Sequence, residues 1–142
     1  MAVIAAEIQL EWRGEVRLQD LPLLAATKCW KGAILAYDAA GFIISMSDTA
    51  GLKMAGIANE TVDNTGASGA KSIEVANGEV KLPGSSLEQA DAGRLVYAGG
   101  DSQTVTDGTA ATNDIPCGTL VEFISATSGW VNTLAIPEVA ST

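Results

Sequence analysis

The sequence contains no histidine, and this absence narrows the functions it could perform. Histidine is the usual general base for a serine or cysteine nucleophile, and it is the commonest protein ligand of transition metals. Without it, catalysis would depend on Asp, Glu or Lys alone, and no motif supplies those residues in a catalytic arrangement. We therefore predict a protein that is not an enzyme and that binds no metal and no cofactor.

Basic residues are also scarce. The chain has 8 Lys and Arg against 17 Asp and Glu, which gives a formal net charge of −9. Such a balance repels the phosphate backbone of nucleic acids, so we expect no direct contact with DNA or RNA. An acidic surface also favours solubility, because like charges keep copies apart.

Aromatic residues make up 5% of the chain, and there are two cysteines, Cys29 and Cys117. Hydrophobic residues nevertheless reach 47%, so the sequence predicts one folded domain with a core of Val, Ile and Leu. One distant cysteine pair is not a disulfide framework, so we expect free thiols, with a single disulfide as the alternative. The N-terminal apolar patch has no basic leader and is short, which predicts neither a secretory signal nor a membrane span.

Fifteen glycines and many Ser, Thr, Asn and Asp residues interrupt the apolar runs at short intervals. This texture is typical of an all-β protein, and we predict a small barrel or sandwich of about eight or nine short strands with one short helix. The N-terminal strand or extended arm is predicted over residues 1–27, the β domain over 28–137 and a tail over 138–142.

Four local signals locate the predicted elements. Two apolar runs joined by a glycine-containing turn predict a hairpin, followed by a third strand. Asn77-Gly78 between two alternating runs predicts another hairpin with a tight turn. Ser86 as N-cap and Gly93 as stop predict the short helix. The ranges are 33–37 with 42–46 and then 54–58; 72–76 with 79–82; helix 87–93; and a closing hairpin of 118–124 with 130–136.

Residues 1–27 contain the clearest period-2 alternation in the chain. Apolar side chains alternate with polar ones, as in a strand with one buried face. The pattern fits an edge strand of the domain itself, or an arm that adds to the sheet of a neighbour. The candidate interface residues are Ile8, Leu10, Trp12, Val16 and Leu18. For the three tryptophans core filling is the default interpretation and contact with another subunit is the alternative, for which Trp12 is the best candidate.

Other candidate sites depend on weaker patterns. Asp101 and Asp107 lie in a turn-rich region without the spacing of a calcium loop. Glu74 and Glu79 would face each other across the predicted Asn-Gly hairpin, as a carboxylate pair or as a solvated face. The loop 107–114, together with the tryptophans, would form the site of a small-ligand or carbohydrate-binding β module, which is the alternative function.

Eight short stretches of strand and turn residues form a recognisable order along the chain: 31–35 (KGAIL), 38–43 (DAAGFI), 47–51 (SDTAG), 55–58 (AGIA), 62–66 (VDNTG), 73–75 (IEV), 89–97 (QADAGRLVY) and 104–106 (TVT). In this order they resemble the capsid cement, or head decoration, proteins of tailed bacteriophages. The similarity covers about residues 28–136 and consists of strand and turn patterns rather than a catalytic signature. Residues 1–27 have no counterpart that can be mapped.

The resemblance implies a β-rich structural protein on the outer surface of a virion, made in the cytoplasm of the bacterial host. Its partners would be the major capsid protein and further copies of itself, commonly as a homotrimer at threefold positions. The resemblance brings no catalytic residues, no cofactor, no membrane contact and no direct contact with nucleic acid.

Overall fold

The computed structural model describes residues 7–99, 102–107 and 113–134. The described chain is almost entirely β, which confirms the predicted fold class. No helix within these ranges is long and apolar enough to cross a membrane. The elements are β1 Trp12–Pro22, β2 Thr27–Cys29, β3 Ile34–Tyr37, β4 Ile43–Ser45, β5 Lys53–Ala58, β6 Val62–Asn64, β7 Ser72–Ser85, the 3₁₀ turn η1 Gln89–Asp91, β8 Leu95–Ala98, β9 Val105–Thr106, β10 Pro116–Ser125 and β11 Ser128–Asn132.

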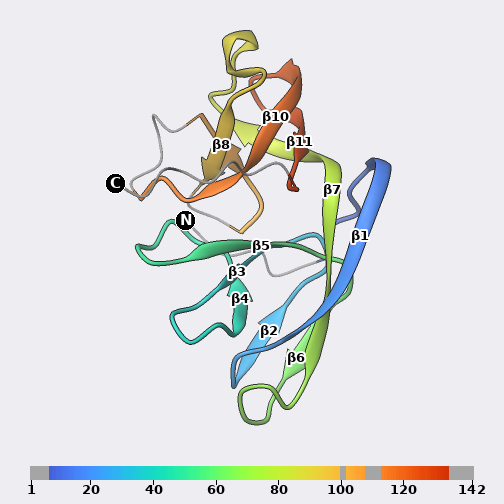
Figure 1. Cartoon of the computed structure of the whole chain (residues 1–142), viewed down its shortest axis with the longest axis vertical. Coiled ribbons are helices and arrows are strands. Elements are labelled where there is room, and N and C mark those ends of the chain that lie inside the picture. The colour runs from blue at the N-terminus through green and yellow to red at the C-terminus, as the bar shows by residue number, and fades with distance from the viewer. Residues whose placement is uncertain (1–6, 100–101, 108–112, 135–142) are drawn as a thin grey trace.

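The long strand β7 connects the two halves of the molecule (Figure 1). Its C-terminal half belongs to a closed barrel of five strands. The barrel order is β7, β9, β8, β10 and β11, and β11 returns to pair with β7. Closure leaves no free sheet edge in this half, because each strand has a partner on both sides.

The N-terminal half of β7 carries the rest of the main sheet. On one edge it pairs with β5, which continues to β3 and β4. On the other edge it pairs with β1. Strands β2 and β6 form a separate two-stranded sheet. The β3–β4 hairpin and the third strand β5 confirm the first predicted unit, and the Asp38 carboxylate accepts the backbone N–H of Ala40 and Phe42 at 2.9 Å in its turn.

Strand β3 lies between two hydrophobic cores. Ile34 and Ala36 pack with the barrel, whereas Ala33 and Leu35 pack in a second cluster with Leu23 and its neighbours. All four of these residues from 33 to 36 have no exposed surface. A strand buried on both faces reads as a continuous apolar run rather than an alternating one, and the sequence has this run.

The predicted hairpin at Asn77-Gly78 is wrong, because β7 runs unbroken through both residues. Tertiary pairing overrides the local turn signal. The Gly78 N–H bonds to Thr133 Oγ1 at 3.0 Å, and the Asn77 side chain donates to the Ala55 carbonyl at 3.0 Å. A Cβ at Gly78 would lie 2.6 Å from the carbonyl oxygen of Glu15 in β1. The glycine therefore permits close approach of a neighbouring strand and makes no turn.

The predicted helix over 87–93 is shorter than expected and begins elsewhere. Only the 3₁₀ turn η1 forms, with Glu88 as its N-cap residue and not Ser86. The Glu88 N–H donates to Asp91 Oδ2 at 2.8 Å. Leu87 is 2% exposed and packs into the barrel core, so burial of this one side chain sets the path of the segment. The closing hairpin is confirmed as β10 and β11, although residues 135 and 136 lie outside the described residues.

Candidate interaction surface

Strand β1 has a partner on one edge only. Residues 17–22 pair in register with residues 77–72 of β7, and Trp12 and Arg13 pair with Val80 and Glu79. Between these two stretches, three residues of β1, 14–16, lie opposite Gly78 alone, so β1 bulges there. Two alternatives were predicted for residues 1–27, an edge strand and an extended arm. Residues 12–22 form the edge strand. Residues 1–6, and the predicted tail 138–142, lie outside the described residues.

Backbone hydrogen bonds define which groups of β1 face outward. Leu23 N–H donates to the Lys71 carbonyl at 2.9 Å, and the Glu74 carbonyl accepts from Asn59 on the far edge of β7. Because backbone groups alternate in direction along an antiparallel strand, residues 17, 19 and 21 bond to β7. The N–H and C=O groups of Leu18 and Asp20 then point away from it. Among the described residues, no strand pairs with this outer edge.

Exposure separates the five predicted interface residues into two groups. Ile8, Leu10 and Trp12 are half-buried, and the last two pack against the barrel core. Trp12 therefore packs on the core of its own chain, which was the default interpretation for the tryptophans. Val16 and Leu18 are 37% and 52% exposed, and every residue from 14 to 20 is exposed. The structure brings only these two together on an open surface.

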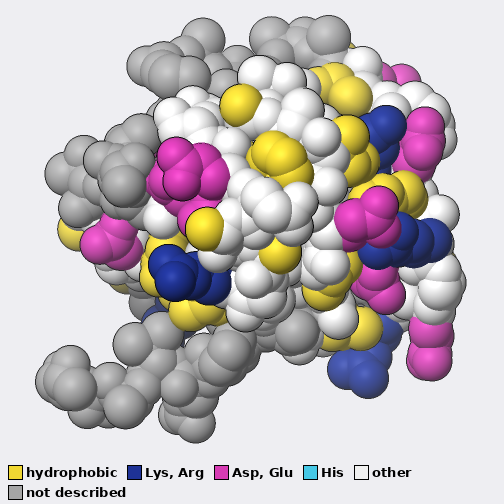
Figure 2. Space-filling model, turned by 90° about the horizontal axis from the view of Figure 1, so that it is seen from above, with side chains coloured by type: hydrophobic (Ala, Val, Ile, Leu, Met, Phe, Trp, Pro, Cys, Tyr) yellow, Lys and Arg dark blue, Asp and Glu magenta, His cyan; other side chains and the backbone are white. Residues whose placement is uncertain are grey.

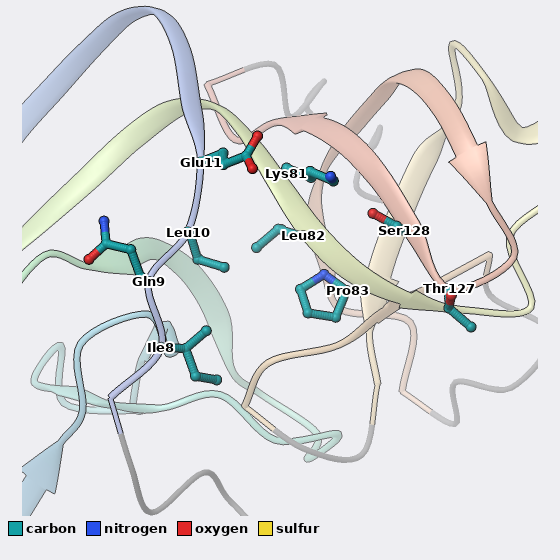
Figure 3. A pocket seen from close by; sticks show the side chains of 9 residues that line it. All are labelled: Ile8, Gln9, Leu10, Glu11, Lys81, Leu82, Pro83, Thr127 and Ser128. Atoms are coloured by element: carbon teal, nitrogen blue, oxygen red, sulfur yellow. The ribbon is translucent and has the colours of Figure 1, made fainter.

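A shallow groove lies beside the buried group (Figure 3). Its volume is about 320 Å³. Figure 3 shows Ile8 and Leu10 on the N-terminal segment facing Leu82 and Pro83 of β7, with the β10–β11 turn at the far side. The Glu11 carbonyl accepts the Lys81 N–H at 2.9 Å, so the segment joins β7 at this point. The groove is at the lower limit of the volume that small-molecule sites have.

The Arg13 side chain contacts residues of three other strands. Its Nε lies 2.9 Å from Glu79 Oε1, and its Nη1 lies 2.8 Å from Glu122 Oε1 on β10. Its guanidinium carbon lies 4.3 Å from the ring centroid of Trp130 on β11. The hydrogen bonds that Arg13 donates to Glu122, with the larger effect, and to Glu79 raise the pKa of Arg13. Sequence reasoning did not identify this cluster, because its members come from four separate strands.

The outward face of β1 near its C-terminal end is acidic. Asp20 lies directly opposite Glu74 in the β1–β7 register. Glu60 Oε2 accepts the Glu74 N–H at 2.9 Å, and Glu74 Oε1 accepts from Asn59 Nδ2 at 2.6 Å, so Glu60 lies at the edge of β7 that faces away from β1. Both salt bridges found among the described residues are made by Arg13, so none of these three carboxylates is paired with a cation there. Figure 2 shows basic and acidic side chains interspersed on the right-hand side, where β1 lies in Figure 1.

Of the other sequence-predicted sites, the structure tests the Glu74 and Glu79 pair, which is not assembled. Glu74 and Glu79 lie on the same strand, roughly 16 Å apart at the usual strand rise, and do not face each other across a hairpin. No group of three His, Cys, Asp or Glu able to hold a metal occurs in the described ranges. Asp101 and residues 108–112 lie outside them, so the predicted loop is described only at its ends.

Two of the three tryptophans have a ring face covered by a basic side chain of the same chain. Trp130 and Trp30 each have a cation over one ring face, Arg13 for the former and Lys28, at 4.0 Å from the centroid, for the latter. A sugar-binding platform needs an open ring face, which these contacts reduce.

Both cysteines are free, as predicted, and buried. Desolvation raises the pKa of Cys117 to about 12 and also raises that of Cys29, so neither thiol is a ready nucleophile at neutral pH.

Comparison of the chain with protein-family models, with curated proteins and with solved structures found no match. The open edge of β1, the groove beside it and the acidic face at its C-terminal end are therefore interpreted from their own geometry and chemistry.

Proposed function

We propose that this protein is a structural cement protein of a bacteriophage head. It binds the outer surface of the shell, contacts the major capsid protein and further copies of itself, and stabilises the contacts between capsomers. The resemblance of residues 28–136 to cement proteins suggests this role. The observation that supports it best is the exposed strand β1, which offers an unpaired edge and the apolar side chains of Val16 and Leu18.

An unpaired edge strand is a ready template for another chain, because its N–H and C=O groups need partners. Bulges and prolines commonly protect such an edge, and in β1 the bulge at 14–16 and Pro22 leave only the short exposed stretch between them open to a partner. Main-chain bonds to an added strand give affinity with little demand on the sequence of the partner. That mode suits a protein that must attach at many equivalent positions.

The charge of the chain fits the outside of a shell. A net charge of −9 disfavours contact with packaged DNA. Many modest contacts, repeated over a lattice, sum to a large resistance against disassembly, because binding to the assembled state alone stabilises that state.

Binding to shells is the direct test. Purified protein is added to expanded capsids that lack their own decoration protein, and occupancy is measured by sedimentation and gel densitometry. We expect saturable binding and a higher temperature of capsid disruption. Saturable binding that leaves this temperature unchanged would contradict the stabilising role, and absence of binding would contradict the function as a whole.

The homotrimer is tested separately, by light scattering of the free protein and by a map of decorated particles. We expect three copies around a threefold or quasi-threefold position on the shell. Single, separated copies at other positions would contradict the trimer but leave the attachment to the shell standing.

A further inference from the structure

We propose that the outer edge of β1 binds an extended, basic segment of the shell subunit, which adds as a strand beside Leu18 and Asp20. This inference rests on the proposed function and specifies the partner at that same surface. The segment would carry an apolar side chain opposite Leu18 and a Lys or Arg opposite Asp20.

The available hydrogen-bonding groups define a short docking site. The N–H and C=O of Leu18 and Asp20 point outward, and Pro22, the next outward-facing residue, has no N–H to donate. On the other side the site ends at the bulge, where Gly14 has a φ of +71°. An added strand therefore has regular backbone partners only between the bulge and Pro22.

The side chains beside this site determine the charge of the occupant. Leu18 is 52% exposed, and it lies on the same face of β1 as Asp20, because side chains two residues apart share a face. Glu74 lies directly opposite Asp20 in the β1–β7 register. Opposite charges on directly paired residues stabilise strand pairs, and like charges destabilise them. Neither Asp20 nor Glu74 has a salt-bridge partner in the described chain, so this pair of like charges favours a cationic residue opposite Asp20 on the incoming strand.

A second copy of β1 fits this edge poorly. In a symmetric antiparallel pair, an outward-facing residue must lie opposite another outward-facing residue. A twofold axis at Asp20 places the two copies of Asp20 opposite each other. A twofold axis at Gln19 places Asp20 of one copy opposite Leu18 of the other. An axis at Leu18 places Asp20 against Val16 within the bulge. None of these registers gives Asp20 a cation, so self-association through this edge is not favoured.

A proline substitution tests the backbone part of the proposal. Leu18→Pro removes an outward N–H and leaves the ladder to β7 intact, and β1 already accepts a proline at the outward position 22. Leu18→Ala is the matched control, since it shortens the side chain but keeps the N–H. On expanded capsids we expect at least about a tenfold loss of affinity for the proline variant and a smaller loss for the alanine variant.

A charge reversal tests the electrostatic part, and it does so without altering the backbone. Asp20→Lys is compared with Glu88→Lys, which makes the same charge change at an exposed position next to η1. We expect a loss of about fivefold or more for Asp20→Lys at low salt that shrinks as salt is raised, and little change for Glu88→Lys. Thermal melting of all variants checks that they are folded.

A photo-crosslinking residue in place of Leu18 identifies the occupant. We expect a product of the mass of this chain plus the shell subunit, with the attachment site in a segment rich in Lys or Arg. A product joining two copies of this chain would overturn the proposal in favour of self-association.

The outcomes separate the two proposals. If the wild-type protein does not bind shells, the cement function fails. If it binds and both Leu18→Pro and Asp20→Lys bind equally well, the function stands and the assignment of the β1 edge is wrong.

Discussion

The closed barrel and strand β1 differ in how their backbone and apolar groups are satisfied. In the barrel, each strand has partners on both edges, and side chains such as Leu120 and Val131 have no exposed surface. In β1, one edge is paired and residues 14–20 are exposed. We infer from this difference that the barrel contributes most of the stability of the fold. The free edge of β1, by contrast, could be covered by another chain without any unfolding of the domain.

The comparison predicts the largest loss of stability from a truncation inside the barrel. Leu120→Ala on β10 removes a fully buried side chain from the core cluster. We expect a loss of about 2–5 kcal/mol in the free energy of unfolding, measured by urea denaturation, because a cavity forms where the chain cannot collapse. A loss below about 0.5 kcal/mol would mean that the barrel is not the stabilising half.

High pH should weaken the barrel through Cys117. Burial raises the pKa of this thiol from 9.0 to about 12, so the folded state favours the neutral form. The stability it contributes is complete below pH 9 and is lost as the pH rises toward 12, by about 1.4 kcal/mol per pH unit at most. Cys117→Ala lacks this titration and is the control. The wild type should lose about 2 kcal/mol more than the variant between pH 8 and 10.5, and identical pH profiles would show that the thiol is not desolvated.

Gly78→Ala should lower the stability of the fold at the place where β1 packs against β7. The added Cβ would lie 2.6 Å from the Glu15 carbonyl, so the β1 bulge must move away from β7. We expect a loss of about 1–3 kcal/mol in stability, of the size typical for overpacking. Hydrogen exchange should show faster exchange of the amides of Leu21 in β1 and of Leu23 just after it, with those of β3 unchanged. Equal acceleration in both strands would mean that β1 is not a separable edge.

The smallest effect is expected at the exposed surface of β1. Leu18→Ala should change the free energy of unfolding by no more than about 0.5 kcal/mol, since this side chain is 52% exposed. Urea denaturation measures it beside Leu120→Ala. Nearly equal losses of unfolding free energy for the two variants would show that the barrel and the edge strand contribute similarly to stability.

Local sequence patterns were sufficient for the pieces of the fold whose partners are near in the chain. The β3–β4 hairpin, β5 and the β10–β11 hairpin were predicted, because apolar runs and turn residues such as Asp38 specify them within a few residues. The alternating pattern around Trp12 also predicted a strand.

Patterns failed where a distant partner decides the structure. Asn77-Gly78 has the sequence of a tight turn, yet β7 continues because β1 lies against Gly78 and Thr133 bonds to it from the opposite edge. The Arg13 cluster with Glu79, Glu122 and Trp130 was missed for the same reason.

The sequence by itself determined that this chain is all-β, acidic and free of histidine, since composition and period-2 patterning require no knowledge of pairing. Only the tertiary structure decided which half of the alternating N-terminal segment is covered. Leu10 and Trp12 pack on the barrel, whereas Val16 and Leu18 lie beyond the bulge and remain exposed. The physical reason is that β7 holds β1 in register along one edge, whereas among the described residues no strand pairs with the other edge of β1. Such pairing is set by residues about sixty positions away in the sequence.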